Sequence, residues 1–209
     1  MSLVTKAPTL LVSESNNLAV QINTGGTGYI SILDSSNIVL SNILFNATTP
    51  LGTPDSTTGI ATIPGVLNGS AISVGIAATF KLYSGAANEL FRGFIGANYI
   101  FTTDNSTNLF TVTNNNFVIG DEVLVSSNNI LPSPLSSVIS YFVISAGTNI
   151  QISSTLGGST IVLTDNGTGI HKIRKSSSSL ILNSGNTNPL QVSSGQVIFI
   201  SSFSYDPEA

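Results

Sequence analysis

The chain of 209 residues is long enough for one large or two small domains, and its 41% of hydrophobic residues is ample for a core. Disordered chains combine low hydrophobicity with high net charge, so a mean hydropathy of +0.36 argues against disorder. Only 8% of the residues are charged, where about 25% is usual in globular proteins. Ser, Thr and Asn must therefore supply most of the polar surface, and so few charges protect a monomer poorly against self-association.

The charge balance and the residue counts argue against several kinds of site. The formal net charge is −4 and the pI is about 4.6, whereas a nucleic-acid binder needs basic patches. Lys172, Arg174 and Lys175 are half of the six basic residues. We interpret them as a solvated boundary segment, because no second basic patch or aromatic platform accompanies them. The chain has no cysteine and one histidine, His171, which excludes disulfides, thiolate sites and multi-histidine metal sites.

No targeting or membrane-spanning segment is predicted. The first seventeen residues contain one lysine and a short apolar run interrupted by Pro8, which does not fit a signal peptide. No window approaches 18 uninterrupted apolar residues, the length that suggests a membrane span. We therefore expect a soluble protein that is made in the cytoplasm and has no membrane partner.

The first part of the chain predicts short strands separated by turns. Gly25–Gly28 predicts a turn, and Ala47–Ile60, with two prolines and two glycines, predicts a loop. Short apolar or alternating runs, as in the strands of a sandwich or barrel, occur at Thr9–Val12, Ala19–Ile22, Tyr29–Leu33, Asn37–Leu40, Ile43–Phe45, Ile60–Ile63 and Gly69–Val74.

A hairpin is predicted next. Ile76–Tyr83 has the clearest alternation of apolar and polar residues in the chain, and Glu89–Ile95 is expected to return beside it. A short helix over Ala86–Arg92 is the alternative, although Gly85 and Gly93 would leave it under two turns.

The second half also predicts strands. Asn98–Asn116 is expected to be a junction with one or two short strands, at Tyr99–Thr102 and Leu109–Thr113. Leu131–Pro134 cannot be a central strand, because proline donates no ladder hydrogen bond. Further strands are expected at Glu122–Ser126, Tyr141–Ser145, Asn149–Ser153, Ser159–Leu163, Leu180–Leu182 and Gly195–Tyr205. No segment shows ten residues of helical periodicity without Gly or Pro, so the predicted fold class is all-β, an antiparallel sandwich or barrel.

No catalytic residue, cofactor site or metal site is predicted. The adjacent pair Asp121-Glu122 would point to opposite faces of a strand, and we interpret it as the start of a turn. Asp165–Gly169 lacks the further carboxylates of a calcium site, and Gly25–Gly28 lacks the lysine and helix of a phosphate loop. His171 has no nucleophile motif beside it. A carbohydrate-active enzyme would need paired carboxylates across a cleft, and the ten acidic residues are too scattered to nominate a pair.

Several aromatic residues could belong either to a core or to a subunit interface, and composition favours the core. They are Tyr141, Phe142, Phe199, Phe203 and Tyr205.

Two groups of residues resemble virion structural proteins of tailed bacteriophages. The first is similar to a small β-module that recurs as an insertion or appendage in phage tail and capsid-surface proteins. It comprises Phe117-x-x-Gly-Asp-x-Val, Leu131-Pro, Tyr141-Phe-Val-Ile, Gly157-Gly158 and Thr164-Asp-x-Gly-Thr-Gly-x-His171. The second resembles a β-domain of phage particle proteins. It comprises Gly75-x-Ala-x-Thr-Phe-x-x-Tyr83, Arg92-Gly-x-Ile-Gly96, Leu180-Ile-Leu-Asn183 and Gly195-Gln-Val-Ile-Phe-Ile-Ser-Ser-Phe203. The chain departs from the second pattern in a longer junction and in turns that carry Ser or Asn where acidic residues are expected.

These resemblances imply an inserted module. We expect a discontinuous β-sandwich of residues 1–100 and 176–209, with a small β-module and its junctions at 101–175. They further imply a non-enzymatic capsid decoration (cement) protein on the surface of the virion, a homotrimer whose partner is the major capsid protein. A tail, baseplate or receptor-binding component that contacts the host surface is the alternative.

Overall fold

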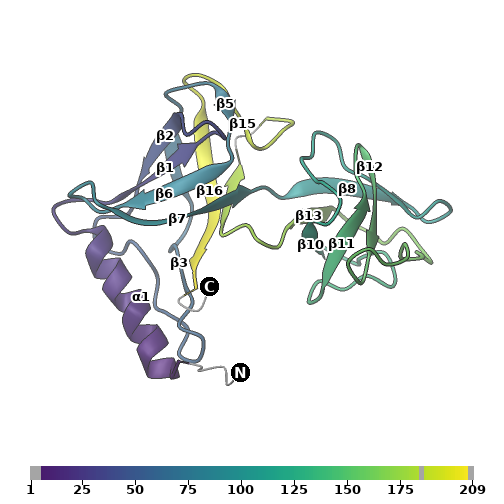
Figure 1. The fold of residues 1–209 in the computed structure, drawn as a ribbon, viewed down its shortest axis with the longest axis horizontal. Helices are drawn as coiled ribbons and strands as arrows, with labels where there is room; N and C mark the ends of the chain where they lie inside the picture. Colours follow the sequence, from purple (N-terminus) through teal and green to yellow (C-terminus); the bar gives the residue numbers. More distant parts are fainter. Residues whose placement is uncertain (1–5, 184–185, 207–209) are drawn as a thin grey trace. The chain divides into compact units, whose positions relative to one another are not determined.

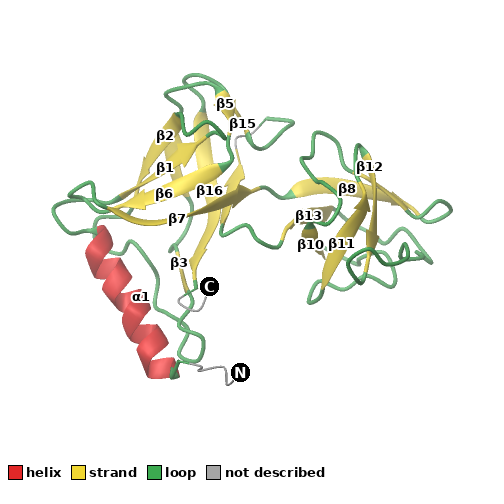
Figure 2. Cartoon of the chain, in the orientation of Figure 1, coloured by secondary structure: helices red, strands yellow, loops and turns green. Residues whose placement is uncertain are grey.

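The computed structural model describes residues 6–183 and 186–206, which are mostly strand with one helix (Figures 1 and 2). The helix α1 spans Pro8–Ile22. The strands are β1 (Tyr29–Leu33), β2 (Val39–Leu44), β3 (Ala61–Thr62), β4 (Leu67–Ser70), β5 (Gly75–Ile76), β6 (Thr79–Tyr83), β7 (Glu89–Gly96), β8 (Tyr99–Asp104), β9 (Leu109–Thr111), β10 (Glu122–Ser127), β11 (Ser140–Ser145), β12 (Asn149–Ser153), β13 (His171–Lys175), β14 (Leu180–Asn183), β15 (Gln191–Val192) and β16 (Val197–Tyr205). The predicted all-β class is confirmed.

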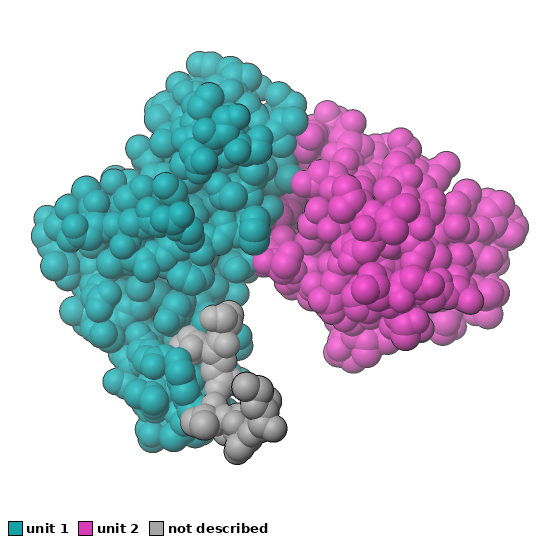
Figure 3. All heavy atoms as spheres, viewed as in Figure 1, with its two compact units in different colours: residues 1–95, 179–186, 190–209 teal, residues 96–178, 187–189 magenta. Residues whose placement is uncertain are grey.

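The chain divides into two compact units. Unit 1 contains residues 1–95, 179–186 and 190–209, and unit 2 contains residues 96–178 and 187–189 (Figure 3). The sequence predicts divisions after residues 100 and 175, a few residues from the observed ones. β7 and β14 are neighbours in the sheet of unit 1, and β8 and β13 are neighbours in unit 2. The crossings at residues 95–96 and 178–179 therefore join adjacent strands of unit 1 to adjacent strands of unit 2, and residues 187–189 are a further short segment of unit 2.

Unit 1 is built on an eight-stranded sheet. The strand order is β2-β1-β6-β7-β14-β16-β3, and β4 pairs with β16 beside this path. The other edge of β4 reaches β2, because Ser41 pairs with Ala71 in a single bridge and the Ser41 hydroxyl donates to the carbonyl oxygen of Ser70 over 2.8 Å. The sheet therefore curls until its strands β2 and β4 meet.

The core of unit 1 joins segments that are far apart in the sequence. Phe203 on β16 is fully buried and packs edge-on against Phe80 of β6, with ring centroids 5.6 Å apart. Phe45 and Phe91 contact the same ring. β16 also pairs with β3 and β4, so the last strands of the chain complete the sheet that the first hundred residues begin.

Helix α1 corrects the prediction of strands at Thr9–Val12 and Ala19–Ile22. Its buried residues are Leu11, Ser15, Leu18 and Ile22, a helical stripe that sequence reasoning missed because one of its members is polar. The Ser15 hydroxyl donates to the carbonyl oxygen of Gly59 over 2.5 Å, so the loop before β3 supplies the partner that makes this polar residue acceptable in the buried stripe. Pro8 stands at the helix start, where its missing N–H has no cost.

Unit 2 is a closed barrel with the strand order β10-β11-β12-β9-β8-β13. The short strands predicted in the junction, at Tyr99–Thr102 and Leu109–Thr113, are present as β8 and β9 and form part of the barrel wall. The strand predicted at Ser159–Leu163 is wrong. Ile161 donates one backbone hydrogen bond to Ile152, but the N–H of Leu163 donates to the Asn108 side chain instead of a ladder.

The hairpin of unit 1 agrees with the first of its two predicted forms. β6 and β7 pair in antiparallel register from Thr79↔Phe94 onward, and the alternative helix at Ala86–Arg92 does not form. The turn between the strands places Ala87 at a positive φ of 61°. Leu131–Pro134 lies outside the strands, as predicted.

Candidate functional site

The wall of the barrel in unit 2 contains a partly open hollow of about 400 Å³. It lies where the pairing between β8 and β13 ends, because Phe101 pairs with His171 whereas Thr168 pairs with Ile130 instead. The hollow is lined by Ile100, Phe101, Thr102, Thr103, Asn166, Gly167, Thr168, Gly169, Ile170 and His171. Apart from His171, this lining has no ionisable side chain. Its volume lies in the range of small-molecule sites, but two of its polar groups bond within the protein: the Thr103 hydroxyl donates to the carbonyl oxygen of Asn166, and Asn166 Oδ1 accepts the N–H of Asn105.

His171, singled out by the sequence, lies at this hollow and is only 5% exposed. Its Nε2 lies 3.2 Å from the carbonyl oxygen of Asn166, which can only accept, so Nε2 carries a proton and donates. Its Nδ1 lies 3.1 Å from the Ser127 hydroxyl, and the ring packs on Phe101 with centroids 5.3 Å apart. His171 therefore ties the segment around Asn166 to the end of β10.

The Ser127–His171 contact is a Ser–His pair that sequence spacing did not reveal. The Ser127 oxygen also lies 3.1 Å from the Thr168 carbonyl, to which it can donate, and it accepts the N–H of Asn129 over 3.1 Å. Its one hydrogen is thus shared between His171 and a carbonyl, and Ser127 does not line the hollow. A nucleophile needs a base that takes its proton, whereas the hydrogen of this hydroxyl is also directed to the Thr168 carbonyl oxygen.

The segment Asp165–Gly169, for which a tight turn is predicted, is instead a loop in which Thr168 pairs with Ile130 in an isolated bridge. Asp165 accepts the backbone N–H groups of Ser133 and Gly167, so its carboxylate is used to hold two loops together. Gly167 has φ +62°, and a Cβ there would come within 2.5 Å of the carbonyl oxygen of Ile130. In residues 6–183 and 186–206, no three His, Cys, Asp or Glu side chains lie close enough to hold a metal.

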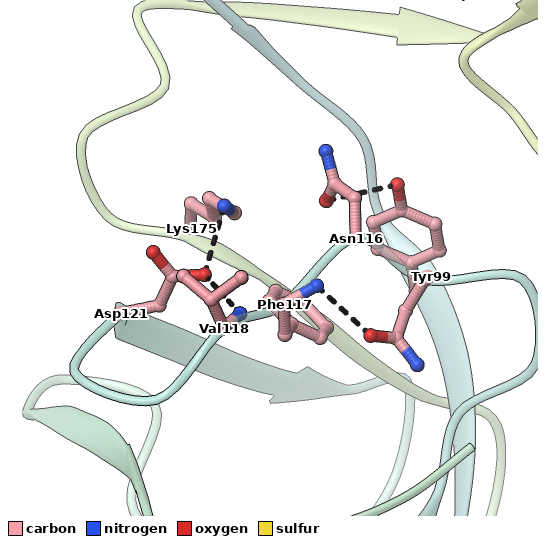
Figure 4. A network of polar contacts seen from close by, with 7 residues as sticks. Tyr99, Asn116, Phe117, Val118, Asp121 and Lys175 are labelled. Atoms are coloured by element: carbon pink, nitrogen blue, oxygen red, sulfur yellow. Dashed lines mark hydrogen bonds and ion pairs between the residues drawn. The ribbon is translucent and has the colours of Figure 1, made fainter. Parts of the chain in front are cut away.

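The pair Asp121-Glu122 forms two separate structural contacts, of which Figure 4 shows that of Asp121. One oxygen of Asp121 accepts the N–H of Val118 over 2.8 Å and lies 2.8 Å from Lys175 Nζ. Glu122 accepts from the Ser176 hydroxyl over 2.9 Å. Hydrogen bonds from Ser140 and Ser176 lower the pKa of Glu122. The two carboxylates therefore hold separate structural contacts and do not form an acid–base pair.

The same network includes a buried tyrosine that sequence reasoning did not single out. The hydroxyl of Tyr99 donates to Asn116 Oδ1 over 3.3 Å, and its ring packs edge-on against Phe117 (Figure 4). Burial raises the pKa of Tyr99 to about 12. Asn115 accepts the N–H of Phe117 and donates to two carbonyl oxygens. The run of three asparagines before Phe117 was the available signal, because asparagine bonds its own neighbouring backbone in turns.

The basic cluster separates into two parts. Lys175 is paired with Asp121, whereas Lys172 and Arg174 make no ion pair with the carboxylates of the described residues. Lys172 is exposed and stands opposite Ile100 on β8. Burial lowers the pKa of Arg174. Two cations on one strand are too few for the phosphate contacts of a nucleic-acid site.

The aromatic residues nominated for core or interface divide as well. Tyr141 and Phe203 are buried, as the core interpretation predicts. Phe142 and Tyr205 are half-buried, and Phe199 is 39% exposed. The glycines of Gly25–Gly28 form a turn, in which Gly28 lies directly against the carbonyl oxygen of Ile22.

No protein-family model, curated protein or solved structure matches the chain. Among the described residues, no helix is long and apolar enough to cross a membrane.

Proposed function

We propose that the protein is a non-enzymatic structural component of a tailed-phage particle, most specifically a capsid decoration (cement) protein. The observation that carries this proposal is that the surface is rich in hydrophobic side chains and poor in charge. Twenty large hydrophobic side chains among the described residues are exposed, on a chain with only 8% charged residues. Such a surface is poorly protected in isolation and is suited to burial against neighbouring subunits.

The arrangement of polar groups supports a structural role. The carboxylates of Asp55, Asp104 and Asp165 accept backbone N–H groups in turns, and Asp121 and Glu89 are in ion pairs. These side chains are used to hold loops and strands. A glycosidase would instead need two carboxylates facing a common cleft.

The two-unit architecture fits a protein that bridges subunits. The barrel is inserted between adjacent strands of unit 1, which leaves the pairing of the host sheet intact. In the proposed role, the protein assembles as a homotrimer and contacts the major capsid protein. Many modest contacts repeated by symmetry would then hold neighbouring capsid subunits together.

The test is the copy number of the chain in purified particles. Quantitative mass spectrometry should find the protein at on the order of hundreds of copies per particle, as closed shell symmetry requires. Absence from particles would refute the proposal.

The hollow in the barrel favours a second candidate, a tail, baseplate or receptor-binding component. A partly open hollow of about 400 Å³ is large enough for a small group on a host surface. A copy number of about three, six or twelve would support this candidate, because tail structures have low rotational symmetry.

A further inference from the structure

One face of unit 1 carries no charge and remains exposed. It is formed by β2, β4 with its flanking residues, and β16, which adjoin one another through the Ser41↔Ala71 bridge and the β16–β4 ladder. Every second residue from Val66 to Val74 is exposed. We call this surface the uncharged face; its residues are Asn42, Leu44, Val66, Asn68, Ser70, Ile72, Val74, Val197, Phe199 and Ser201, all of them exposed.

The register places the side chains of this face side by side. Phe199 pairs with Asn68, and Val197 pairs with Ser70. On the other edge of β4, a Cβ on Gly69 would touch the side chain of Ile43, so Leu44 and Asn68 are neighbours on the outer side. Leu44, Val197 and Phe199 thus surround Asn68 and Ser70 on the outer side of the sheet, and the exposed residues Val66, Ile72 and Val74 stand in the chain just before and after β4.

The uncharged face is large enough for a specific interface. Leu44, Val66, Ile72 and Val74 each expose about three-fifths of their surface, and Val197 and Phe199 expose 47% and 39%. Together these six side chains present on the order of 500 Å² of apolar surface, a size that marks an interaction site. With the four polar residues between them, the face approaches the roughly 800 Å² that each partner buries in a standard interface.

We infer that the uncharged face binds the same face of a second copy of this chain. A face that binds the same face of another copy is related to it by a twofold axis, so this inference goes beyond the proposed function and adds a dimer contact to the proposed homotrimer. A partner with charged side chains would lose their hydration here and find no counter-charge, which is costly. A second copy brings an equally uncharged surface, so the formal charge of −4 on each chain creates no repulsion within the contact. A lipid surface is disfavoured, because helices and patches that lie on membranes carry basic residues at their rim.

The polar groups of the face also match a copy of themselves. An amide side chain both donates and accepts, so Asn68 of one copy can bond an asparagine of the other. Asn42 accepts from Ser31 over 2.6 Å, and the residue is exposed. A face that pairs with itself is the usual arrangement of closed homo-oligomers.

The test is the molar mass of the purified full chain in solution, measured by light scattering during size-exclusion chromatography. The wild-type chain should have the mass of two chains of 21.6 kDa, or an even multiple of that chain mass, at tens of micromolar, by order of magnitude a concentration where an interface of this size is populated. Phe199→Asp places like charges opposite each other and should reduce the mass to 21.6 kDa. Phe94→Asp is the matched control, since Phe94 is 65% exposed on β7 of the same unit, and its mass should equal that of the wild type.

Mixing identifies the second copy as the occupant. Chains with Phe199→Asp and chains with Phe199→Lys should each be monomeric, and an equimolar mixture should recover association. Circular dichroism shows whether a variant that has lost mass is still folded. Phe199→Asn is a neutral polar variant for the case in which Phe199→Asp unfolds, and a folded but dissociated Phe199→Asn chain supports the inference.

Three results would overturn it: a monomeric wild-type chain, including one that binds vesicles; a Phe199→Asp chain with the wild-type mass; or a mixture that stays monomeric. These outcomes are separate from the test of the proposed function. A monomeric chain that is abundant on particles would remove this inference alone, whereas an oligomer absent from particles would remove only the proposed function.

Discussion

Replacing Phe203 by alanine should destabilise unit 1 and leave unit 2 unchanged. Phe203 is fully buried, and its ring contacts Phe45, Phe80 and Phe91 at centroid distances of 5.6–6.5 Å. A Phe→Ala change at such a site removes the transfer free energy of the ring and leaves a cavity, which costs about 3–5 kcal/mol. Because a domain has only about 5–15 kcal/mol of stability, this loss is a large share of the stability of unit 1.

The assay is native-state hydrogen exchange followed by NMR, at one fixed protein concentration because association adds to stability. Slow amides of β1, β6 and β16 should exchange with a free energy of opening lowered by about 3–5 kcal/mol, whereas amides of β10 and β12 should keep theirs. Phe94→Ala is the control, since its side chain is 65% exposed, and it should cost at most about 0.5 kcal/mol. Equal losses in both units would refute the two-unit division, and a loss under about 1 kcal/mol would refute the role of Phe203 in the core.

Three further predictions concern single contacts. Gly59→Ala should destabilise unit 1 by about 1–3 kcal/mol more than Gly195→Ala. The two glycines have similar φ, 71° and 73°, but a Cβ on Gly59 would lie 2.5 Å from Leu11 Cβ, whereas a Cβ on Gly195 would meet no atom within 4 Å. Equal losses in thermal unfolding would refute the packing of α1 on this loop. Lys175→Gln should lower the free energy of unfolding of unit 2 by up to about 1 kcal/mol at low salt, because it removes the contact with Asp121. Lys172→Gln should cause no measurable change in the same urea titrations. A similar effect of both substitutions would contradict the pairing of Lys175 with Asp121. The pKa of Tyr99 is raised from 10 to about 12 in the folded protein, which favours the protonated phenol in the folded state. The resulting contribution to the free energy of unfolding is therefore complete below pH 10 and is lost as the pH rises toward 12. The loss should be on the order of 3 kcal/mol, from a shift of about two pKa units, and Tyr99→Phe should remove this part of the pH dependence of unfolding. An unchanged slope above pH 10 would contradict the prediction.

Most strands could be predicted because their signal is local. The alternation in Ile76–Tyr83 and the apolar runs at Tyr141–Ser145 and Asn149–Ser153 correspond to β6, β11 and β12, since a strand between turns needs only a period of two. The helix at Pro8–Ile22 could not be predicted in this way. Its stripe includes Ser15, whose partner is a carbonyl oxygen 44 residues away, and no local pattern reveals such a partner.

The contacts of the candidate site were equally non-local. The sequence identified His171 and Asp165–Gly169 as residues to weigh, and both lie at or beside the hollow of unit 2. Their roles depend on Ser127, Ser133 and Ile130, which are at least 32 residues away along the chain. Lys175 and Asp121 likewise meet only because β13 pairs with β10.

The sequence by itself determined that the chain forms short strands with uncharged polar surfaces, because alternation, turn residues and composition are properties of neighbouring residues. Only the tertiary structure decided which strands pair, where the pairing between β8 and β13 ends at the hollow, and that α1 replaces two expected strands. It also decided that the exposed sides of β2, β4 and β16 join into one uncharged face. These strands lie far apart in the sequence, and their register, which sets the side chains that become neighbours, is fixed by long-range hydrogen bonds and core packing.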